Sequence, residues 1–253
     1  MTRMKLFSTA AALIAGAGIM MAAESNEPCF HLSFDEGKEG AEVCVDRMKP
    51  DRICKLNNPK RITFADGKIG KALVLDNPPE KTAPNENPMA GVDVLDFWED
   101  DFTKAMSIEV WVKIAKDADY RRSFMRILQC GGQYGLGFSL YYNWANFQFL
   151  TGPTNSSKDA LVVSAPVPDL RDQWVHIAVT YDGTKKVVLL YVNGECVKEM
   201  EDFVITPPRN RKQPLFIGRM GNSRGWRGAI DEVKIYKRVL PPAEILGHAK
   251  LEL

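Results

Sequence analysis

Acidic side chains are the first residues in this sequence whose types and positions could support chemistry. Asp231 alternates with Val233 and Ile235 in an apolar run, so its carboxylate is expected on an otherwise apolar strand face. A buried carboxylate must be hydrogen-bonded, protonated or bound to a metal. Asp231 is therefore a metal ligand, an acceptor of backbone N–H groups, or the partner of an arginine such as Arg227, and the sequence leaves these alternatives open.

Motifs of hydrolytic and nucleotide chemistry are missing from the sequence. It contains no G-x-S-x-G, P-loop or H-E-x-x-H motif. His176 and Tyr181 fall on opposite faces of one expected strand, so they do not form the shared Tyr/His pair that a lyase would use. His31 and His248 have no partner close by in the sequence. We therefore expect no catalytic residues in this chain.

Two stretches combine aromatic rings with polar side chains, at residues 141–146 and 222–227. Sugars stack on aromatic faces and take hydrogen bonds from polar groups, and protein ligands also use such rings as anchors. A structural role competes with this one, since half of the rings in the first stretch would fill a core and Trp226 could plug one end of the fold. The candidate ligand-binding residues are Tyr142, Trp144, Asn146, Arg224, Trp226 and Arg227.

The element expected to organise the scaffold is the segment 173–196. Two apolar runs flank Asp182-Gly183, and Asn193-Gly194 ends the second run; both dipeptides tolerate the positive φ angles of tight turns. The second run is apolar on both faces, as expected of a strand covered on both sides. We predict that this hairpin lies at the middle of an all-β, two-sheet antiparallel β-sandwich. The first run should place one set on the core face: Val175, Ile177, Val179 and Tyr181.

Short runs with strand periodicity continue on both sides of this hairpin. We expect roughly ten to twelve strands in one domain, from turn signals spaced as in an all-β sandwich. A short C-terminal helix follows Pro241-Pro242, because proline suits the first turn of a helix. Residues 38–60 and 77–91 are expected to be loops, and residues 94–104 a short helix or an irregular segment.

Residues 1–23 have the features of a secretory signal peptide. Arg3 and Lys5 precede an apolar run, and Ala22-Ala23 provide small residues for cleavage. The alternative is an anchor that stays attached, because the run is close to the minimum length that spans a bilayer. After cleavage we expect one domain at residues 24–253, exported to the periplasm, the cell surface or the medium, with no transmembrane helix.

Charge and cysteine content limit the classes of partner and the cellular compartment that fit this sequence. The chain has 33 Lys and Arg residues against 32 Asp and Glu residues, and this balance argues against a nucleic-acid surface, which needs a basic excess. All five cysteines follow the signal peptide, where an oxidising compartment favours pairing. Cys44 and Cys54 flank a polar loop and are the predicted disulfide. Cys130 with Cys196 is a second option, and one cysteine is left over.

The order of several motifs resembles the laminin-G-like domains of the concanavalin A-like lectin/glucanase superfamily in exported bacterial proteins. The motifs are LSFDEG at 32–37, GKIGKALVLD at 67–76, WVHIAVTYDG at 174–183 and IDEVKIY at 230–236. The resemblance runs from Phe30 to Ile245 and implies a jelly roll, frequently a structural calcium ion and often carbohydrate binding. It also implies that the first and last strands are close, so that Asp35 and Asp231 could share calcium with loop carbonyls. Residues 43–56 depart from the family pattern, and this departure puts the metal site in question.

The resemblance also bears on catalysis and on partners. Glucanases of this fold carry two working carboxylates on one strand as E-x-D-x-x-E, and the sequence lacks that triplet. The expected function is an exported, non-catalytic binding module for glycans at the cell envelope or outside the cell. The alternatives are a protein-interaction or structural envelope component without a sugar site, and a divergent glycan hydrolase or lyase.

Overall fold

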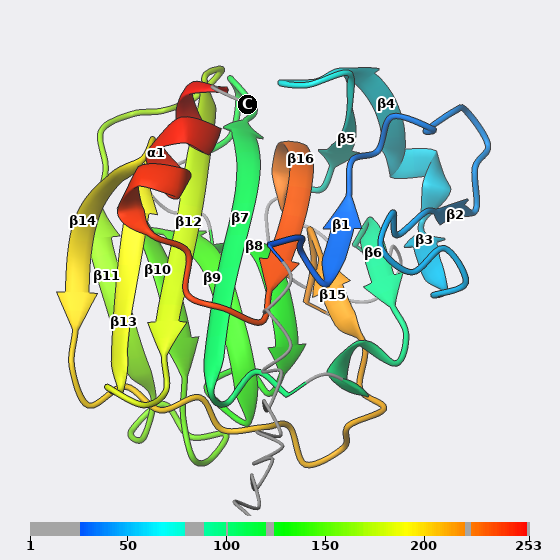
Figure 1. The fold of residues 1–253 in the computed structure, drawn as a ribbon. Helices are drawn as coiled ribbons and strands as arrows, with labels where there is room; N and C mark the ends of the chain where they lie inside the picture. Colours follow the sequence, from blue (N-terminus) through cyan, green and yellow to red (C-terminus); the bar gives the residue numbers. More distant parts are fainter. Residues whose placement is uncertain (1–25, 79–88, 100, 120–123, 221–223, 252–253) are drawn as a thin grey trace, which may run out of the picture.

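The computed structural model describes residues 26–78, 89–99, 101–119, 124–220 and 224–251. Within them the chain folds into two antiparallel sheets packed face to face, with one α-helix lying on the outside of one sheet (Figure 1). This is the predicted two-sheet antiparallel sandwich with a short C-terminal helix. The predicted signal peptide at residues 1–23 lies outside the described residues. No helix among the described residues is long and apolar enough to cross a membrane.

The first sheet, called sheet A, has eight strands. Their order is β14-β13-β12-β7-β16-β5-β4, and β1 pairs with β16. The bounds are β1 (Phe30–Leu32), β4 (Ile62–Asp66), β5 (Lys71–Asp76), β7 (Ala105–Ile114), β12 (Trp174–Asp182), β13 (Val187–Val192), β14 (Glu195–Met200) and β16 (Arg227–Tyr236).

The second sheet, called sheet B, also has eight strands, in the order β11-β10-β9-β8-β15-β6-β3-β2. Helix α1 (Pro242–Lys250) follows the last strand of sheet A, and two 3-10 helices lie at Pro59–Arg61 and Phe97–Glu99. The strand bounds are β2 (Val43–Cys44), β3 (Cys54–Asn57), β6 (Gly91–Val94), β8 (Phe124–Gly131), β9 (Gly137–Asn143), β10 (Asn146–Thr151), β11 (Leu161–Pro166) and β15 (Leu215–Ile217).

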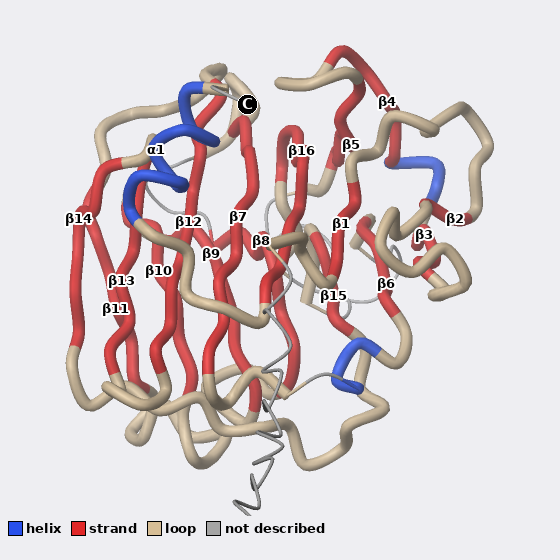
Figure 2. Tube along the Cα trace, viewed as in Figure 1, coloured by secondary structure: helices blue, strands red, loops and turns tan. Residues whose placement is uncertain are grey.

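The β12–β13 hairpin occupies the predicted place in sheet A. The residues of β12 expected on the core face are buried between the sheets, from Val175 to Tyr181. The opposite face of the hairpin is covered too, because α1 packs there and buries Ile245 against Ala178 and Tyr191 (Figures 1 and 2). This helix explains why β13 is apolar on both faces. The β13–β14 turn is Asn193-Gly194, with φ angles of 51° and 84°.

The segment 38–60 was expected to be a loop, and this prediction is wrong. It contains β2 and β3, which form one edge of sheet B, and the described residues hold sixteen strands where fewer were expected. These two strands are short and bury only every second side chain, among them Cys44 and Leu56. The charged residues between them hide this alternation in the sequence.

Cys44 and Cys54 are register partners across β2 and β3. Directly opposed residues of an antiparallel pair have Cα atoms about 4.5–5.5 Å apart, which suits the roughly 4.4–6.8 Å range of disulfides. Both side chains are buried, and the Cys44 thiol donates to the Cys54 carbonyl at 3.8 Å. The structure contains all five cysteines as thiols, so the disulfide stays a prediction. Cys130 is buried in sheet B and Cys196 is exposed in sheet A.

We expect Cys44 and Cys54 to form a disulfide in protein purified from an oxidising compartment. Closing a loop of this length stabilises the fold by up to about 3 kcal/mol. Peptide mapping without reductant should find the linked pair, and the double Cys44→Ser, Cys54→Ser variant should unfold at lower denaturant. The matched control, Cys196→Ser, should unfold like the parent. Finding five titratable thiols in the denatured, unreduced chain would contradict the pairing.

Candidate functional site

The start of β8 and the end of β9 carry stacked rings and guanidinium groups on the outer face of sheet B. The rings of Phe124 and Tyr141 stack with centroids 4.8 Å apart and planes 10° apart. The Arg126 guanidinium carbon lies 4.3 Å from the Tyr141 centroid and 4.9 Å from that of Phe124. Arg224 lies 4.3 Å from the Phe124 centroid. These four residues are called the Arg–aromatic cluster.

The Arg–aromatic cluster has a buried layer and a more accessible one. Arg126 and Tyr141 are buried, and Arg126 bonds to the Ser139 hydroxyl. Phe124 and Arg224 are only partly covered. Burial raises the pKa of Tyr141, while the positive charges of Arg126 and Arg224 oppose that rise. The buried arginine and phenol thus support an outer layer made by Phe124 and Arg224, which is partly exposed to solvent.

Trp144 extends this surface at the tip of the β9–β10 hairpin. It follows Asn143, the register partner of Phe124, and is 65% exposed. Trp144 and Ala145 form the two-residue turn with φ angles of 52° and 60°, and Arg224 also has a positive φ, of 55°. Left-handed backbone costs a non-glycine residue about 1 kcal/mol or more. Strain at exposed residues beside a ring cluster is typical of functional positions.

The other predicted binding residues are placed differently. Asn146 donates from its amide to the Trp144 carbonyl at 2.7 Å and so supports the turn. Arg227 is held by Asp76 at 2.9 Å and by Asp117 at 2.6 Å. The structure therefore places Arg224 against Phe124 and Trp144 one residue beyond the register partner of Phe124, and gives Asn146 and Arg227 supporting contacts.

Tyr142 and Trp226 need correction, because both are fully buried. The Tyr142 ring packs edge-on against Phe147 in the core at a centroid distance of 5.3 Å. The Trp226 indole N–H donates to the Ala229 carbonyl at 3.1 Å, and its ring belongs to the main core. Neither ring presents a face to a ligand. Trp226 is the packing plug that the sequence offered as the competing role.

Asn77 is a buried residue that the sequence analysis missed, and it organises the chain around Trp226. Its side-chain oxygen accepts from the Ala90 N–H at 2.7 Å. Its amide donates to the carbonyls of Ala90 and Trp226, both at 2.9 Å. One side chain therefore joins the end of β5, the start of β6 and the segment before β16. In the sequence it looks like an ordinary loop asparagine before two prolines.

Asp35 and Asp231 both reach the β4–β5 turn, as the proposed calcium site requires, but the donors there are N–H groups. Asp231 accepts from the backbone of Lys68 at 2.8 Å and Ile69 at 3.0 Å, and Asp35 accepts from Lys71 at 3.0 Å. Such donors do what a cation would do for the carboxylate, so these two residues do not fit calcium in this arrangement. No group of three or more His, Cys, Asp or Glu side chains in the described ranges is placed to hold a metal. Calcium binding itself stays an untested prediction.

The titration of Asp231 reflects its burial. Burial raises its pKa to about 7, the negative Glu232 adds to the rise, and the N–H groups of Ile69 and Lys68 oppose it. Acceptance of backbone N–H groups was one of the sequence-based alternatives for Asp231. That alternative is the arrangement seen in the structure.

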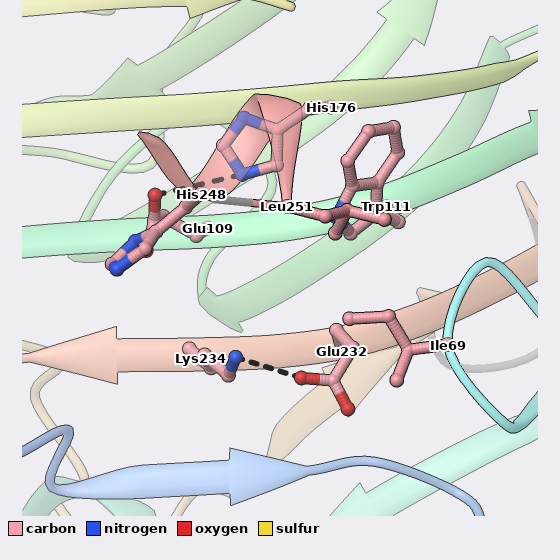
Figure 3. A pocket seen from close by; sticks show the side chains of 8 residues that line it. All are labelled: Ile69, Glu109, Trp111, His176, Glu232, Lys234, His248 and Leu251. Atoms are coloured by element: carbon pink, nitrogen blue, oxygen red, sulfur yellow. Dashed lines mark hydrogen bonds and ion pairs between the residues drawn. The ribbon is translucent and has the colours of Figure 1, made fainter. Parts of the chain in front are cut away.

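A second cluster lies on the outer face of sheet A, beside α1 (Figure 3). His248 of α1 contacts Glu109 of β7 at 2.8 Å, and His176 of β12 approaches the same carboxylate at 3.5 Å. Glu232 of β16 contacts Lys234 at 2.7 Å. The residues that line the pocket between these groups are Ile69, Glu109, Trp111, His176, Glu232, Lys234, His248 and Leu251.

His31 and His248 have no partner close by in the sequence, yet both contact buried glutamates in the structure. His31 lies 3.1 Å from Glu232, across a sequence separation of 201 residues, and His248 is separated from Glu109 by 139 residues. Burial raises the pKa of Glu232, but the hydrogen bonds from His31 and Lys234 outweigh it and lower the pKa to about 2. No local sequence signal links residues so far apart.

The sheet A pocket contains two glutamates, so it bears on the hydrolase alternative. Both carboxylates are already bound by neighbouring side chains and are buried. The pocket holds about 20 Å³ that the centre of a water molecule can reach, whereas sites for organic ligands span roughly 300–1,000 Å³. A sugar ring cannot enter it in this conformation, so this pocket gives no support to the hydrolase alternative.

Comparison with known proteins identifies a matching family and two sequence relatives. Residues 90–246 match the family model described as the concanavalin A-like lectin/glucanases superfamily. This match covers more than half of the chain. The chain belongs to the concanavalin A-like lectin/glucanase superfamily. A segment of 102 residues, 39% of the chain, is 28% identical to mouse and human pappalysin-1 and spans 6% of those proteins.

Solved structures of this superfamily architecture include two informative neighbours. Domain 4 of an extracellular arabinanase from Geobacillus stearothermophilus, in complex with arabinotriose, matches 88% of this chain and 98% of that domain, with 22% identity and a TM-score of 0.61. The botulinum neurotoxin serotype D binding domain matches 89% of this chain and 52% of its own, with 13% identity and a TM-score of 0.64. At these identities the likeness concerns the fold.

Proposed function

We propose that this superfamily member is an exported, non-catalytic module that binds glycans through the Trp144 end of sheet B. The observation that carries the proposal is Trp144 itself, a tryptophan that is 65% exposed and held at a φ of 52°. An exposed ring in strained backbone contributes little to the core, so its cost has to be offset by another role. The arabinotriose complex of the arabinanase domain supports carbohydrate as the ligand class.

The surface supplies the contacts that sugars use. The Trp144 ring offers a face for stacking. The Phe124 ring is stacked on Tyr141 and has the Arg224 guanidinium over it at 4.3 Å, and this guanidinium supplies N–H donors for sugar hydroxyls. The buried Arg126 and Tyr141 lie directly beneath, so the outer side chains are supported by a rigid layer. A preformed surface loses less side-chain entropy on binding.

The test compares two neighbouring glycine substitutions in the same turn. Trp144→Gly removes the ring and relieves the strained φ, so it should weaken glycan binding about tenfold or more while the chain becomes slightly more stable. Ala145→Gly relieves the strain at the next position, where φ is 60°, and removes no ring. It should leave binding unchanged.

Binding is measured by affinity electrophoresis and calorimetry on a panel that includes arabinan, xylan, mannan and acidic polysaccharides. Arg224→Ala should weaken binding, and Lys185→Ala, at an exposed charge in the β12–β13 turn, should not. Equal binding by the parent and Trp144→Gly would overturn the site. Binding to no glycan in the panel would count against the function.

A protein-interaction role is the second candidate, and one observation favours it. Five exposed apolar side chains lie on or next to β2, β3 and β6, which are neighbours in sheet B: the Leu95 N–H donates to the Ile53 carbonyl at 2.9 Å, and β2 pairs with β3. Contiguous apolar surface of this kind is typical of contact sites. If the glycan panel fails, a partner for this surface becomes the favoured function. The patch residues are Val43, Val45, Met48, Ile53 and Leu95.

A further inference from the structure

All three histidines of the chain lie in the cluster on the outer face of sheet A, whereas the proposed glycan surface is on sheet B. One of them, His248, is carried by the last turn of α1. Its partner Glu109 projects from β7 and is 2% exposed. This contact therefore joins the end of the C-terminal helix to the middle of the sheet.

Glu109 stands between two imidazoles. His248 contacts its Oε2 at 2.8 Å, and His176 lies 3.5 Å from its Oε1. His176 is buried within β12 and packs against Trp111, with ring centroids 5.1 Å apart and planes 54° apart. A buried carboxylate needs one compensating charge, and the more accessible imidazole can accept a proton at lower cost.

The charges around His248 come from each neighbouring element. Glu109 of β7 and Glu244 of α1 favour its protonated form, while Lys234 of β16 disfavours it. Burial also disfavours the charge, but the hydrogen bond to Glu109 outweighs burial, and the pKa of His248 is raised. Tyr236 of β16 also faces Glu109, whose charge and hydrogen bond add to the effect of burial in raising the pKa of the phenol. A cation in the last turn is stabilised further by the helix dipole.

We propose that His248 and Glu109 form a pH-dependent latch: the protonated imidazole holds the last turn of α1 on sheet A, and its deprotonation loosens that turn. The same turn closes the pocket, because His248 and Leu251 line it together with Glu109, His176 and Trp111 (Figure 3). Loosening the turn uncovers these polar groups to solvent. The first turns of α1 stay docked through Ile245, which is fully buried.

The direction of the pH effect follows from the two histidines. His248 has a raised pKa, so its contribution is complete below about pH 6.5 and is lost as the pH rises through its higher folded-state value. His176 behaves oppositely, since burial lowers its pKa to about 4 and the fold loses stability as the pH falls from about 6.5 towards that value. His176 belongs to β12, so its effect falls on the sheet and not on α1 alone.

The latch is tested by amide hydrogen exchange of residues 249–251, corrected for the intrinsic exchange rate, at about pH 6 and about pH 8. We expect protection to fall roughly two- to fivefold at the higher pH, the range for a cation at a helix C-terminus. His248→Gln should show low protection at both pH values. His31→Gln, which removes the histidine of the neighbouring Glu232 pair, should keep the fall.

A second measurement does not depend on how the variants fold. The His248 imidazole of the native chain, followed by NMR, should titrate with a midpoint above about 6.5, and this midpoint should coincide with the loss of protection. Equal protection at both pH values, or the same fall in His248→Gln as in the native chain, would overturn the latch.

Discussion

Trp226→Ala is expected to destabilise the fold by about 3–5 kcal/mol, the cost of removing a large ring from a packed core. The side chain is fully buried, and its N–H donates to the Ala229 carbonyl at 3.1 Å. For a domain of this size the loss should lower the melting temperature by roughly 6–20 °C. Because whole domains have only about 5–15 kcal/mol of stability, part of the protein should be unfolded at moderate temperature.

Thermal unfolding and glycan affinity of the Trp226→Ala protein separate a core role from a ligand role. A core residue lowers stability and leaves the affinity of the folded fraction nearly unchanged. Trp144→Gly provides the opposite pattern, with intact or improved stability and weakened binding. A Trp226→Ala protein that melts like the parent but fails to bind would show that Trp226 contacts the ligand after all.

Asn77→Ala should cost about 3 kcal/mol or more. The substitution leaves the Ala90 N–H and the carbonyls of Ala90 and Trp226 without the partners they have at 2.7–2.9 Å. Each buried polar group that loses its partner costs about 1–3 kcal/mol. Chemical denaturation should show a lower midpoint with an unchanged slope, because the loss is in the folded state.

Asn77→Asp tests the hydrogen bonds more specifically than Asn77→Ala does. It keeps the shape of the side chain and replaces the amide N–H₂ donor by an acidic oxygen. An ionised carboxylate would face two carbonyl oxygens, so its folded-state pKa should be raised and its stability deficit should grow as the pH rises through that value. The deficit relative to the parent should therefore narrow in acid, where the protonated side chain donates again. A deficit that is the same at all pH values would contradict the hydrogen-bond account.

Strand parity explains why the central architecture could be predicted from the sequence. The alternation in β12 has only one arrangement that places Val175 through Tyr181 between the sheets, and a shift by one residue would move the whole set to the outer face. The strands β2 and β3 could not be found in this way, because they have two and four residues and bury only Cys44, Cys54 and Leu56. Periodicity fails where strands are too short to show a period.

The same parity would have distinguished Tyr141 from Tyr142. Phe138, Leu140 and Tyr142 are buried in the core, whereas Ser139 and Tyr141 share the outer face. In the sequence, the polar Ser139 between the apolar Phe138 and Leu140 marks the outer face of the strand, and Tyr141 lies on that same face. Trp144 and Arg224 were candidates from two separate stretches of the sequence, and their role in binding stays a prediction. The Phe124 ring, 4.3 Å from the Arg224 guanidinium, was missed because it comes from a different strand.

Contacts between segments far apart in the chain could not be predicted from the sequence. The two His–Glu contacts span 139 and 201 residues, and the Asn77 hydrogen bond to Trp226 spans 149. Only the packing of the sandwich brings these residues together. Periodicity and turn signals report on local structure, so they contain no information on such pairs.

Chemical-shift mapping of the tryptophan indole N–H groups during a glycan titration tests the proposed binding surface most directly. The Trp144 signal should shift in proportion to saturation, while those of the buried Trp98 and Trp226 stay in place. Trp144→Gly should remove the responding signal and the binding together. Two results would contradict the proposed site: a Trp144 signal that does not move at saturation, or shifts confined to the backbone amides of Val43, Val45, Met48, Ile53 and Leu95.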